Sequence, residues 1–420
     1  MKYGLIGEKL GHSYSKIIHG MLGDYEYEPH EVAPEELDGF MRAKDFLGIN
    51  VTLPYKEAVI PYLDEIDESV KSIGAVNAIV NRDGRLCGYN TDYYGMKALI
   101  SHAGVEVKGC KAVILGSGGT SKTAKAVLCD LGAKEVFRVS RSGKDGAITY
   151  AEMGEKHLDA QIVVNTTPLG MYPNIFDMPL ALLNLKNPQG VIDAKNPQGV
   201  IDAVYNPLRT MTVMEGRSYG ARAEGGLYML VAQAVRASEI FLDTHYPEKT
   251  TEEIYEKLIR QKENIVLIGM PASGKSTVGK ILAERLGRRF VDTDEEIIRL
   301  TGMSISDIFK NEGECAFRQM EQEVIQRLAG ETSLVIATGG GAILKPRNIY
   351  ALRMNGRIFF IDRPLEKLVP TESRPLSSDR ESIEKRYGER YSTYLSSCDV
   401  RIDADCDANT VAERILENYK

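Results

Sequence analysis

The sequence predicts an α/β protein built from two or three globular units with parallel sheets. Its 420 residues exceed one ordinary hydrophobic core, since domains average about 150 residues. Its composition, 43% hydrophobic and 26% charged with 39 glycines, is typical of soluble α/β proteins. Short apolar runs that end in a glycine-rich or polar turn before a helical pattern indicate strands alternating with helices. Four such runs are Lys111–Leu115, Ile162–Val164, Ile265–Ile268 and Leu334–Ala337.

A polar segment divides the chain into two halves. Residues 244–263 contain Pro247 and a charge-rich helical stretch, and they precede the strand at Ile265–Ile268. Interdomain linkers have this character, so we expect a linker here. The expected domains are an α/β domain at 1–100 completed by a helix at about 227–243, a second α/β domain at 101–226, and a third at 264–420.

Charge and cysteine content exclude several classes of protein. The net charge of −7 and the pI near 5.6 argue against a nucleic-acid-binding surface. No apolar run approaches the roughly 18 residues of a membrane span, and residues 1–11 lack the features of a signal peptide. The six cysteines form no C-x-x-C pair, so neither a zinc site nor a disulfide framework is expected. We expect a cytoplasmic protein with small-molecule ligands and no nucleic-acid or membrane partner; monomer and homodimer both stay open.

The nine residues KNPQGVIDA at 186–194 are repeated without change at 195–203. A solenoid needs at least three stacked units, so this is interpreted as a short tandem duplication. One copy is expected to loop out at the surface.

The segment 269–276, GMPASGKS, matches the P-loop pattern in full, follows a predicted strand and opens a predicted helix. Its glycines let backbone N–H groups face phosphate oxygens, Lys275 can reach the β- and γ-phosphates, and Ser276 can bind Mg²⁺. A chance glycine-rich turn is the alternative, and the complete match argues against it. The predicted ATP-binding residues here are Gly269, Ala272, Ser273, Gly274, Lys275, Ser276 and Thr277.

Acidic and basic residues after the P-loop indicate a second substrate. Asp292 and Asp294 follow a short apolar segment, where one carboxylate can hold Mg²⁺ and the other an acceptor hydroxyl. Further features are Phe317-Arg318-x-x-Glu321, the Thr-Gly-Gly-Gly turn at 338–341, Arg374-Pro-Leu in a polar loop, and Arg390 on a helical stretch. Each arginine alone would be interpreted as a solvated surface residue.

Taken together, these motifs make residues 264–420 resemble shikimate kinase, a nucleoside-monophosphate-kinase-like P-loop fold. The resemblance implies that Arg318, Arg390 and the backbone at 340–341 (Gly340 and Gly341) bind the carboxylate and hydroxyls of shikimate. It also implies that Asp294 orients the 3-hydroxyl. Asp294 and Lys275 are the predicted catalytic residues of this half, and Ser276 and Asp292 the predicted Mg²⁺ ligands. Arg374, on a closing lid, would contact the nucleotide phosphates. A planar guanidinium suits a carboxylate, and phosphoryl transfer depends mainly on positioning and charge neutralisation.

The first half contains the glycine turn 116–121, GSGGTS, between a predicted strand and a predicted helix, which is typical of a dinucleotide-binding fold. The next strand ends in Ser140-Arg141-Ser142 and not in an acidic residue. A cation there favours a 2′-phosphate, hence NADP(H), although Arg141 could equally be a surface charge. The residues expected to bind the coenzyme are Gly116, Ser117, Gly118, Gly119, Thr120, Ser140, Arg141, Ser142 and Gly226.

Small polar clusters precede this turn, and further polar and glycine-rich motifs follow it. They are Ser13-Tyr-Ser15-Lys16, the run NVTLPYK at 50–56, GAVN at 74–77, GYNTD at 88–92, NTTPLGM at 165–171, VYNP at 204–207 and GLYMLVAQ at 226–233. With these motifs, residues 1–243 resemble shikimate dehydrogenase, which has an α/β substrate domain and a Rossmann-like NADP domain.

The resemblance implies a polyol site and a catalytic pair. Ser13, Ser15 and Tyr205 would contact the substrate carboxylate. Thr52, Asn77 and Gln233 would bind the ring hydroxyls. Lys56 and Asp92 would be catalytic, because an ammonium can neutralise and protonate the oxygen of a ketone that accepts hydride.

Three departures from the family pattern concern the coenzyme. Ser140 stands where the family usually has Asn, Ser121 ends the glycine turn, and Tyr228 stands where many members have Gly beside the nicotinamide. The duplication lies directly before Tyr205 and is expected to affect its strand.

The two halves match consecutive steps, reduction of 3-dehydroshikimate with NADPH and phosphorylation of shikimate with ATP. Two alternatives stay open: an NAD-using quinate/shikimate dehydrogenase fused to the kinase, and a metabolite-sensing regulator with one inactive half. We expect no channel between the two sites.

Overall fold

The computed structural model describes residues 2–11, 13–180, 197–369 and 379–419. It divides into two compact units, Met1–Leu258 and Ile259–Lys420, and the division falls within helix α9 (Thr250–Lys262). None of the helices in the described ranges is both long enough and apolar enough to cross a membrane.

Unit 1 begins with a mixed six-stranded sheet of order β2-β1-β3-β5-β6-β4. β3 pairs in parallel with β1 and antiparallel with β5, and β5 and β6 form a hairpin whose two turn residues, Asp83 and Gly84, both have positive φ. This topology brings the ends of β1, β3 and β6 and the start of β5 to one edge. The strands are β1 (Tyr3–Gly7), β2 (Tyr27–Glu31), β3 (Gly48–Val51), β4 (Glu65–Ile66), β5 (Ala78–Arg82) and β6 (Arg85–Tyr89), and the helices are α1 (Ser15–Leu22), α2 (Leu37–Ala43) and α3 (Glu68–Ile73).

The second sheet of unit 1 is parallel throughout, with the order β12-β11-β10-β7-β8-β9. The strand order reverses between β7 and β10, so a crevice for a ligand is expected beyond their carboxyl ends. The strands are β7 (Lys111–Leu115), β8 (Glu135–Ser140), β9 (Ile148–Thr149), β10 (Ile162–Asn165), β11 (Gly199–Asp202) and β12 (Arg222–Glu224), and the helices are α4 (Thr91–His102), α5 (Gly119–Asp130), α6 (Tyr150–Lys156), α7 (Met211–Ser218) and α8 (Leu227–Leu242).

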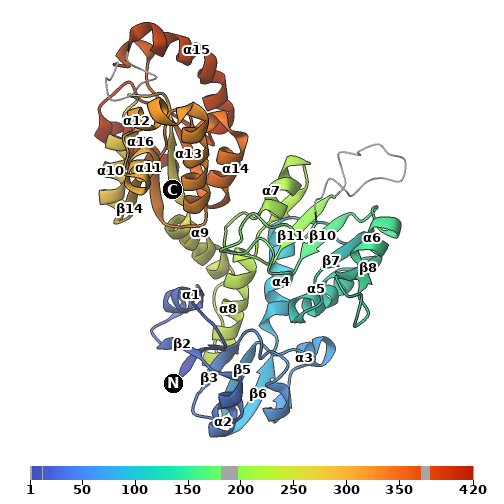
Figure 1. The fold of residues 1–420 in the computed structure, drawn as a ribbon. Coiled ribbons are helices and arrows are strands. Elements are labelled where there is room, and N and C mark those ends of the chain that lie inside the picture. Colours follow the sequence, from blue (N-terminus) through green and yellow to red (C-terminus); the bar gives the residue numbers. More distant parts are fainter. Residues whose placement is uncertain (1, 12, 181–196, 370–378, 420) are drawn as a thin grey trace. The chain divides into compact units, whose positions relative to one another are not determined.

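Helices α4 and α8 run side by side in unit 1 (Figure 1). Their close approach requires a glycine, because a Cβ at Gly95 would lie 2.6 Å from the Met229 carbonyl oxygen. Met96, Leu99 and Met229 join the core that this pair shares with the second sheet.

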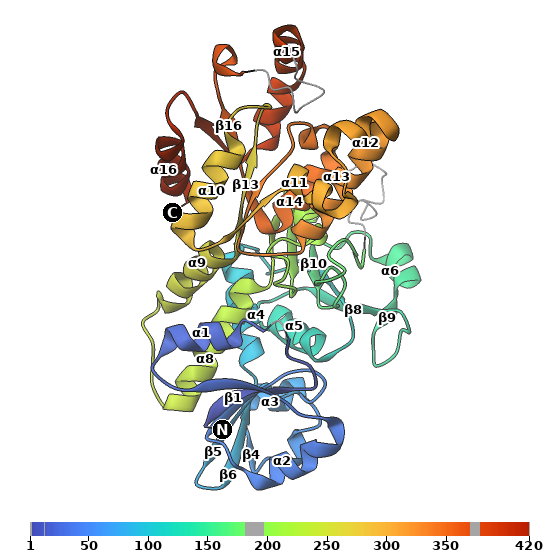
Figure 2. The same ribbon diagram turned by 60° about the vertical axis from the view of Figure 1, so that its left-hand side comes forward.

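Unit 2 contains a parallel five-stranded sheet of order β14-β15-β13-β16-β17. Helices α10 and α16 cover one face of it (Figure 2), and Val278, Leu282 and Ile415 belong to that core. The strands are β13 (Asn264–Ile268), β14 (Arg289–Asp292), β15 (Leu334–Ala337), β16 (Gly356–Asp362) and β17 (Val400–Asp403), and the helices are α10 (Lys275–Leu286), α11 (Thr293–Thr301), α12 (Ile305–Asn311), α13 (Gly313–Ala329), α14 (Pro346–Asn355), α15 (Arg380–Ser397) and α16 (Ala408–Tyr419).

The duplicated nonapeptide meets this fold at β11. The second copy, 195–203, contains β11, whereas the first copy, 186–194, lies outside the described residues together with the expectation that one copy loops out. Arg374 also lies outside them.

Candidate active sites

Lys56 and Asp92 form an ion pair at the polar edge of the first sheet. Lys56 Nζ lies 2.5 Å from Asp92 Oδ2, and the two side chains are only 16% and 10% exposed. Lys56 follows β3, and Asp92 lies in the first turn of α4, which Asn90 caps by accepting a hydrogen bond from the Tyr93 amide. The pair is therefore held by the backbone of two different elements and largely withdrawn from water, where an ion pair is stronger than at the surface.

Asn77 and Gln233 lie beside this pair, and Thr91 connects them. The Asn77 side-chain amide donates to Thr91 Oγ1 at 2.9 Å and approaches Gln233 Oε1 at 3.4 Å, while the Thr91 amide donates to Asn77 Oδ1 at 2.6 Å. Thr91 precedes Asp92, so one network connects the predicted catalytic pair with two predicted hydroxyl-binding amides. The sequence motif contains Thr91 but assigns it no role, because its role depends on a contact with residues far along the chain.

The three residues predicted to contact the substrate carboxylate, Ser13, Ser15 and Tyr205, each carry a hydroxyl group. The hydroxyls of Ser13 and Ser15 lie 3.0 Å apart. Between them in sequence, Tyr14 packs against Tyr205 with ring centroids 5.3 Å apart. Burial, with a smaller contribution from Tyr14, raises the pKa of Tyr205 to about 12, so Tyr205 stays a hydrogen-bond donor at neutral pH. Thr52, the remaining predicted polyol residue, is partly exposed, and its amide donates to the Ile6 carbonyl.

The glycine turn after β7 forms a tight backbone cradle. Gly116 has φ of 121°, and a Cβ there would lie 2.6 Å from Thr166 Oγ1, which itself donates to the Leu115 carbonyl. Gly118 caps α5, and the predicted residues Ser117, Gly119 and Thr120 are at least partly exposed at its first turn. The free amides of such a turn suit a pyrophosphate.

The turn after β8 presents Arg141 at the surface. Ser140 is buried and its Oγ accepts a hydrogen bond from the Gly143 amide, whereas Arg141 and Ser142 are exposed. A cation placed beyond the second strand of such a sheet is suited to a 2′-phosphate. Gly226, the remaining predicted coenzyme residue, caps α8 and is buried.

In unit 2 the P-loop wraps around the side chain of Lys275. Its ammonium donates to the carbonyls of Gly269 and Met270 at 2.9 and 2.8 Å, and the residue is 5% exposed. Ala272 and Gly274 have positive φ, and Gly274 caps α10. Left-handed residues of this kind are part of the backbone geometry of phosphate-binding nests. Ser273 is buried, and Thr277 is exposed in the first turn of α10, at residues 275–286.

Ser276 and Asp292 converge next to the P-loop. Ser276 Oγ donates to Asp292 Oδ2 at 2.6 Å, and the other carboxylate oxygen of Asp292 caps α11 by accepting from the Asp294 amide. A hydroxyl and a carboxylate at hydrogen-bond distance are oxygen ligands of the kind that Mg²⁺ prefers.

A buried cluster of charges surrounds the glycine turn 339–341. A Cβ at Gly339 would lie 2.5 Å from Asp294 Oδ1 and 2.9 Å from Glu321 Oε1, while Gly341 packs directly against the Arg318 guanidinium. Arg318 donates to Glu321 at 2.8 Å, and the Glu321 side chain is fully buried. Burial raises the pKa of Glu321 to about 7, against the opposing attraction of Arg318.

Arg390 reaches the same turn from α15. Its guanidinium donates to the Gly340 carbonyl at 3.2 Å, and Tyr394 donates to that oxygen at 2.5 Å. Burial lowers the pKa of Arg390. Roles for Tyr394 and Glu321 were missed at the sequence level, although their helical spacing, four residues after Arg390 and three after Arg318, places each beside a predicted arginine.

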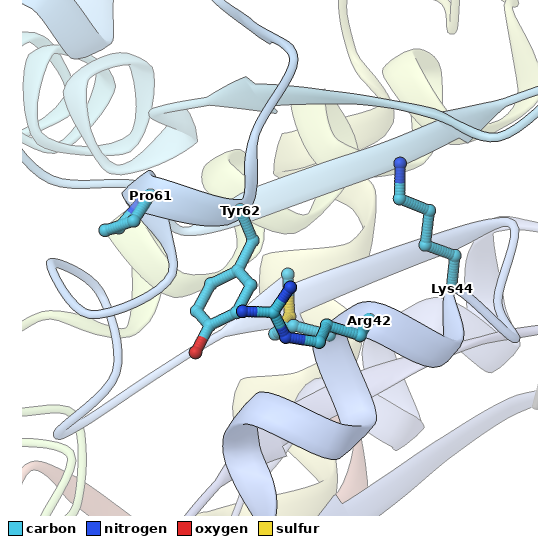
Figure 3. A pocket seen from close by; sticks show the side chains of 5 residues that line it. Arg42, Lys44, Pro61 and Tyr62 are labelled. Atoms are coloured by element: carbon cyan, nitrogen blue, oxygen red, sulfur yellow. The ribbon is translucent and has the colours of Figure 1, made fainter.

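A surface pocket of about 470 Å³ opens elsewhere on unit 1 (Figure 3). Its two basic residues already have acidic partners, Arg42 with Asp38 and Lys44 with Asp64. None of the predicted site residues lines it; its lining consists of Met41, Arg42, Lys44, Pro61 and Tyr62.

Comparison with known proteins assigns the family. The chain is 38% identical over 270 residues to the shikimate dehydrogenase (NADP(+)) of Clostridium beijerinckii, a match that spans 60% of this chain and 96% of that protein. The chain belongs to the shikimate dehydrogenase family. Residues 5–79 of this family member match the shikimate dehydrogenase substrate binding domain, and residues 271–420 match the shikimate kinase family model. It is therefore an enzyme that joins a shikimate dehydrogenase to a shikimate kinase domain.

Solved structures of shikimate dehydrogenases have the same fold as the first part of the chain. Shikimate dehydrogenase 1 from Peptoclostridium difficile is 37% identical with a TM-score of 0.55, covering 61% of this chain and 98% of its own. The enzyme from Thermus thermophilus in complex with NADP(H) and shikimate is 26% identical with a TM-score of 0.54, covering 61% of this chain and 99% of its own. The α/β class with a Rossmann-like dehydrogenase and a P-loop kinase domain, predicted from the sequence, is confirmed.

Proposed function

We propose that this enzyme catalyses two consecutive reactions, NADPH-dependent reduction of 3-dehydroshikimate to shikimate and ATP-dependent phosphorylation of the 3-hydroxyl of shikimate. The observation that carries the proposal is the presence, in separate compact units, of the Lys56–Asp92 pair and of a P-loop with an adjoining Ser276–Asp292 pair. The first unit would produce what the second consumes.

In the reduction, the ketone oxygen of the substrate becomes more negative as the carbon accepts hydride, which NADPH supplies when bound. The Lys56 ammonium stabilises this charge and donates a proton to the oxygen. Asp92 holds the ammonium in place, and Asn77, Gln233 and Thr52 bind the ring hydroxyls. Ser13, Ser15 and Tyr205 donate hydrogen bonds to the carboxylate.

Two features of the coenzyme cradle support its binding of NADP(H). Gly116 leaves no space for a side chain beside Thr166, and this lets the backbone approach a pyrophosphate. Arg141, exposed after β8, pairs with the 2′-phosphate. Gly226, at the start of α8, lies beside the nicotinamide.

In the phosphorylation, Lys275 and the P-loop amides bind the β- and γ-phosphates. Ser276 and Asp292 supply the protein ligands of Mg²⁺, which neutralises phosphate charge when bound. No group of three or more acidic, histidine or cysteine side chains suited to a metal occurs in the described ranges, so phosphate and water oxygens would complete the coordination.

The acceptor site uses the charge cluster of unit 2. Arg318 and Arg390, with the backbone at Gly340 and Gly341, bind shikimate, and Asp294 orients its 3-hydroxyl toward the γ-phosphate. Glu321 fixes the Arg318 guanidinium through the 2.8 Å contact. The proposed lid residue Arg374 would neutralise charge on the transferred phosphoryl group.

Separate assays test the proposal and its alternatives. NADPH oxidation with 3-dehydroshikimate and ADP formation with shikimate are each expected at rates typical of enzymes, about 1 per second or faster. Faster turnover with NAD⁺ and quinate than with NADP⁺ and shikimate would favour the quinate/shikimate alternative. Tight binding of shikimate without either reaction would favour a metabolite sensor and contradict the proposal.

A further inference from the structure

Helix α9, at the end of unit 1, joins an aromatic cluster that includes the first turn of α8. The His102 and Tyr228 rings stack with centroids 3.9 Å apart and an interplanar angle of 17°. Tyr255 of α9 packs edge-on against both rings, at 5.2 and 5.1 Å. The cluster therefore packs α9 against the end of α4 and the start of α8.

The Glu224 carboxylate fixes the polar side of this cluster. Tyr255 donates its hydroxyl to Glu224 Oε1 at 2.9 Å, and His102 Nδ1 lies 2.8 Å from the other carboxylate oxygen. The Glu224 side chain is only 13% exposed, and the adjacent Glu252 of α9 lies 3.6 Å from His102 Nε2. Burial raises the pKa of Tyr255, so it stays a donor. The carboxylate of β12 thus binds residues from both α4 and α9.

Glu224 is followed directly by the glycine bend, defined as Gly225 and Gly226. A Cβ at Gly225 would lie 2.9 Å from the Leu208 carbonyl oxygen, and one at Gly226 would overlap the Ala203 carbonyl. The Gly226 amide also donates to the Val204 carbonyl at 2.9 Å. The backbone of the bend therefore packs against residues 203–208. On the other side, the position of the bend depends on Glu224, whose side chain is held by Tyr255 and His102.

We propose that Tyr255 is a positioning residue for coenzyme binding: by holding Glu224 it fixes the glycine bend against which the nicotinamide of NADP(H) binds. The inference rests on the proposed coenzyme site at Gly226. It assigns helix α9, whose first nine residues lie in unit 1, a part in the dehydrogenase and not only in the connection to the kinase. Tyr255 would act on the coenzyme through Glu224 and the glycine bend.

The variant Tyr255→Phe in the full-length chain tests this role, because it keeps the ring in the cluster and removes the hydrogen bond to Glu224. The dissociation constant of NADPH, followed by its fluorescence, is expected to rise about 3- to 10-fold, which is less than for direct loss of a hydrogen bond to a charged group, because Tyr255 acts through Glu224. Two quantities should change less than about 2-fold: the KM for 3-dehydroshikimate at saturating NADPH, and the kinase rate. The reason is that the first sheet of unit 1 and the whole of unit 2 keep their contacts.

Lys257→Ala is the matched control, since Lys257 is exposed on the same helix and alanine preserves helix propensity. Its NADPH affinity should equal that of the unsubstituted chain. Unchanged NADPH binding in Tyr255→Phe would overturn the inference while leaving the proposed function intact. The inference would also be overturned if the affinities for NADPH and 3-dehydroshikimate fell by similar factors and the unfolding temperature fell with them, because this pattern indicates general destabilisation. An unsubstituted chain that binds no NADPH would contradict the proposed function itself.

Discussion

The Lys56 ammonium lies 2.5 Å from the Asp92 carboxylate, although 36 residues separate the two in the chain. The antiparallel pairing of β3 with β5 and of β5 with β6 returns the chain twice to the same sheet edge, which is why the loop after β3 meets the start of α4. The low exposure of both side chains strengthens the pair and orients the ammonium.

Replacement of Lys56 by alanine should abolish ketone reduction and leave phosphorylation intact. The loss of the proposed proton donor is expected to lower kcat for NADPH oxidation by about 10²- to 10⁴-fold. ADP formation from added shikimate, measured on the same preparation, should not change. Lys71→Ala, which removes an exposed lysine of α3, serves as the control and should leave both rates unchanged. Loss of both activities in Lys56→Ala would show that the two sites are not independent.

The converse variant, Lys275→Ala, should remove only the kinase activity. Lys275 is buried in the P-loop and would contact the transferred phosphoryl group, so we expect kcat for ADP formation to fall at least about 10²-fold. Reduction of 3-dehydroshikimate should proceed at the unsubstituted rate. Lys280→Ala, on the exposed face of the same helix, controls for the loss of a positive charge. Wild-type kinase activity in Lys275→Ala would refute the assignment of this loop.

Arg141 should set the preference for NADPH over NADH. Without its guanidinium the 2′-phosphate loses a charge-assisted hydrogen bond, so Arg141→Ala is expected to lower kcat/KM with NADPH by about 10-fold and to leave NADH unaffected. Lys134→Ala removes a cation that is also exposed, at the start of the same strand region, and should alter neither value. Equal effects of Arg141→Ala on both coenzymes would contradict the role.

Glu321 should make the stability of unit 2 depend on pH. Its pKa is about 7 in the folded protein and 4.5 for an unburied carboxyl, so the folded state binds more protons between these values. The stabilising contribution is therefore complete below about pH 4.5 and is lost as pH rises to about 7, by up to ~3 kcal/mol. Thermal unfolding at several pH values should show a flatter profile over this window for Glu321→Gln. Glu323→Gln, exposed on the same helix, should retain the unsubstituted profile, and an unchanged profile in Glu321→Gln would contradict the prediction.

Deletion of one nonapeptide copy should preserve both activities. Removing either copy produces the same sequence, and the remaining copy supplies β11 with Asp202, which accepts hydrogen bonds from Asn165, Thr210 and the Val204 amide. We expect one copy to loop out, and because insertions of that kind change stability only slightly, both rates should stay within about 2-fold. Insoluble protein or loss of reduction would show that both copies are structurally required.

Local patterns in the sequence were sufficient for several elements. The strand predicted at Lys111–Leu115 coincides with β7, that at Leu334–Ala337 coincides with β15, and the P-loop opens α10 as expected. These features depend on apolar runs and glycine positions within a short window, so a single sequence is enough to find them.

Other features depend on contacts between distant residues. Thr91 contacts both Asn77 and Gln233, and Gln233 is 142 residues from Thr91 in the chain. The hydrogen bond from Tyr255 to Glu224 links the charge-rich helix α9 to the end of β12. No local pattern encodes such pairings, because they follow from strand order and helix packing. This is also why the sequence alone indicates a linker with a helical stretch at 244–263 but not the packing of α9 against His102 and Tyr228.

The most direct test of the account is a single reaction that contains the full-length chain, labelled 3-dehydroshikimate, NADPH and Mg-ATP. We predict labelled shikimate 3-phosphate, with one NADPH oxidised and one ADP formed for each product molecule, and labelled shikimate alone when ATP is omitted. Added unlabelled shikimate should dilute the label in the phosphorylated product, since no channel is expected. Folded protein that consumes neither NADPH nor ATP in this mixture would contradict the account.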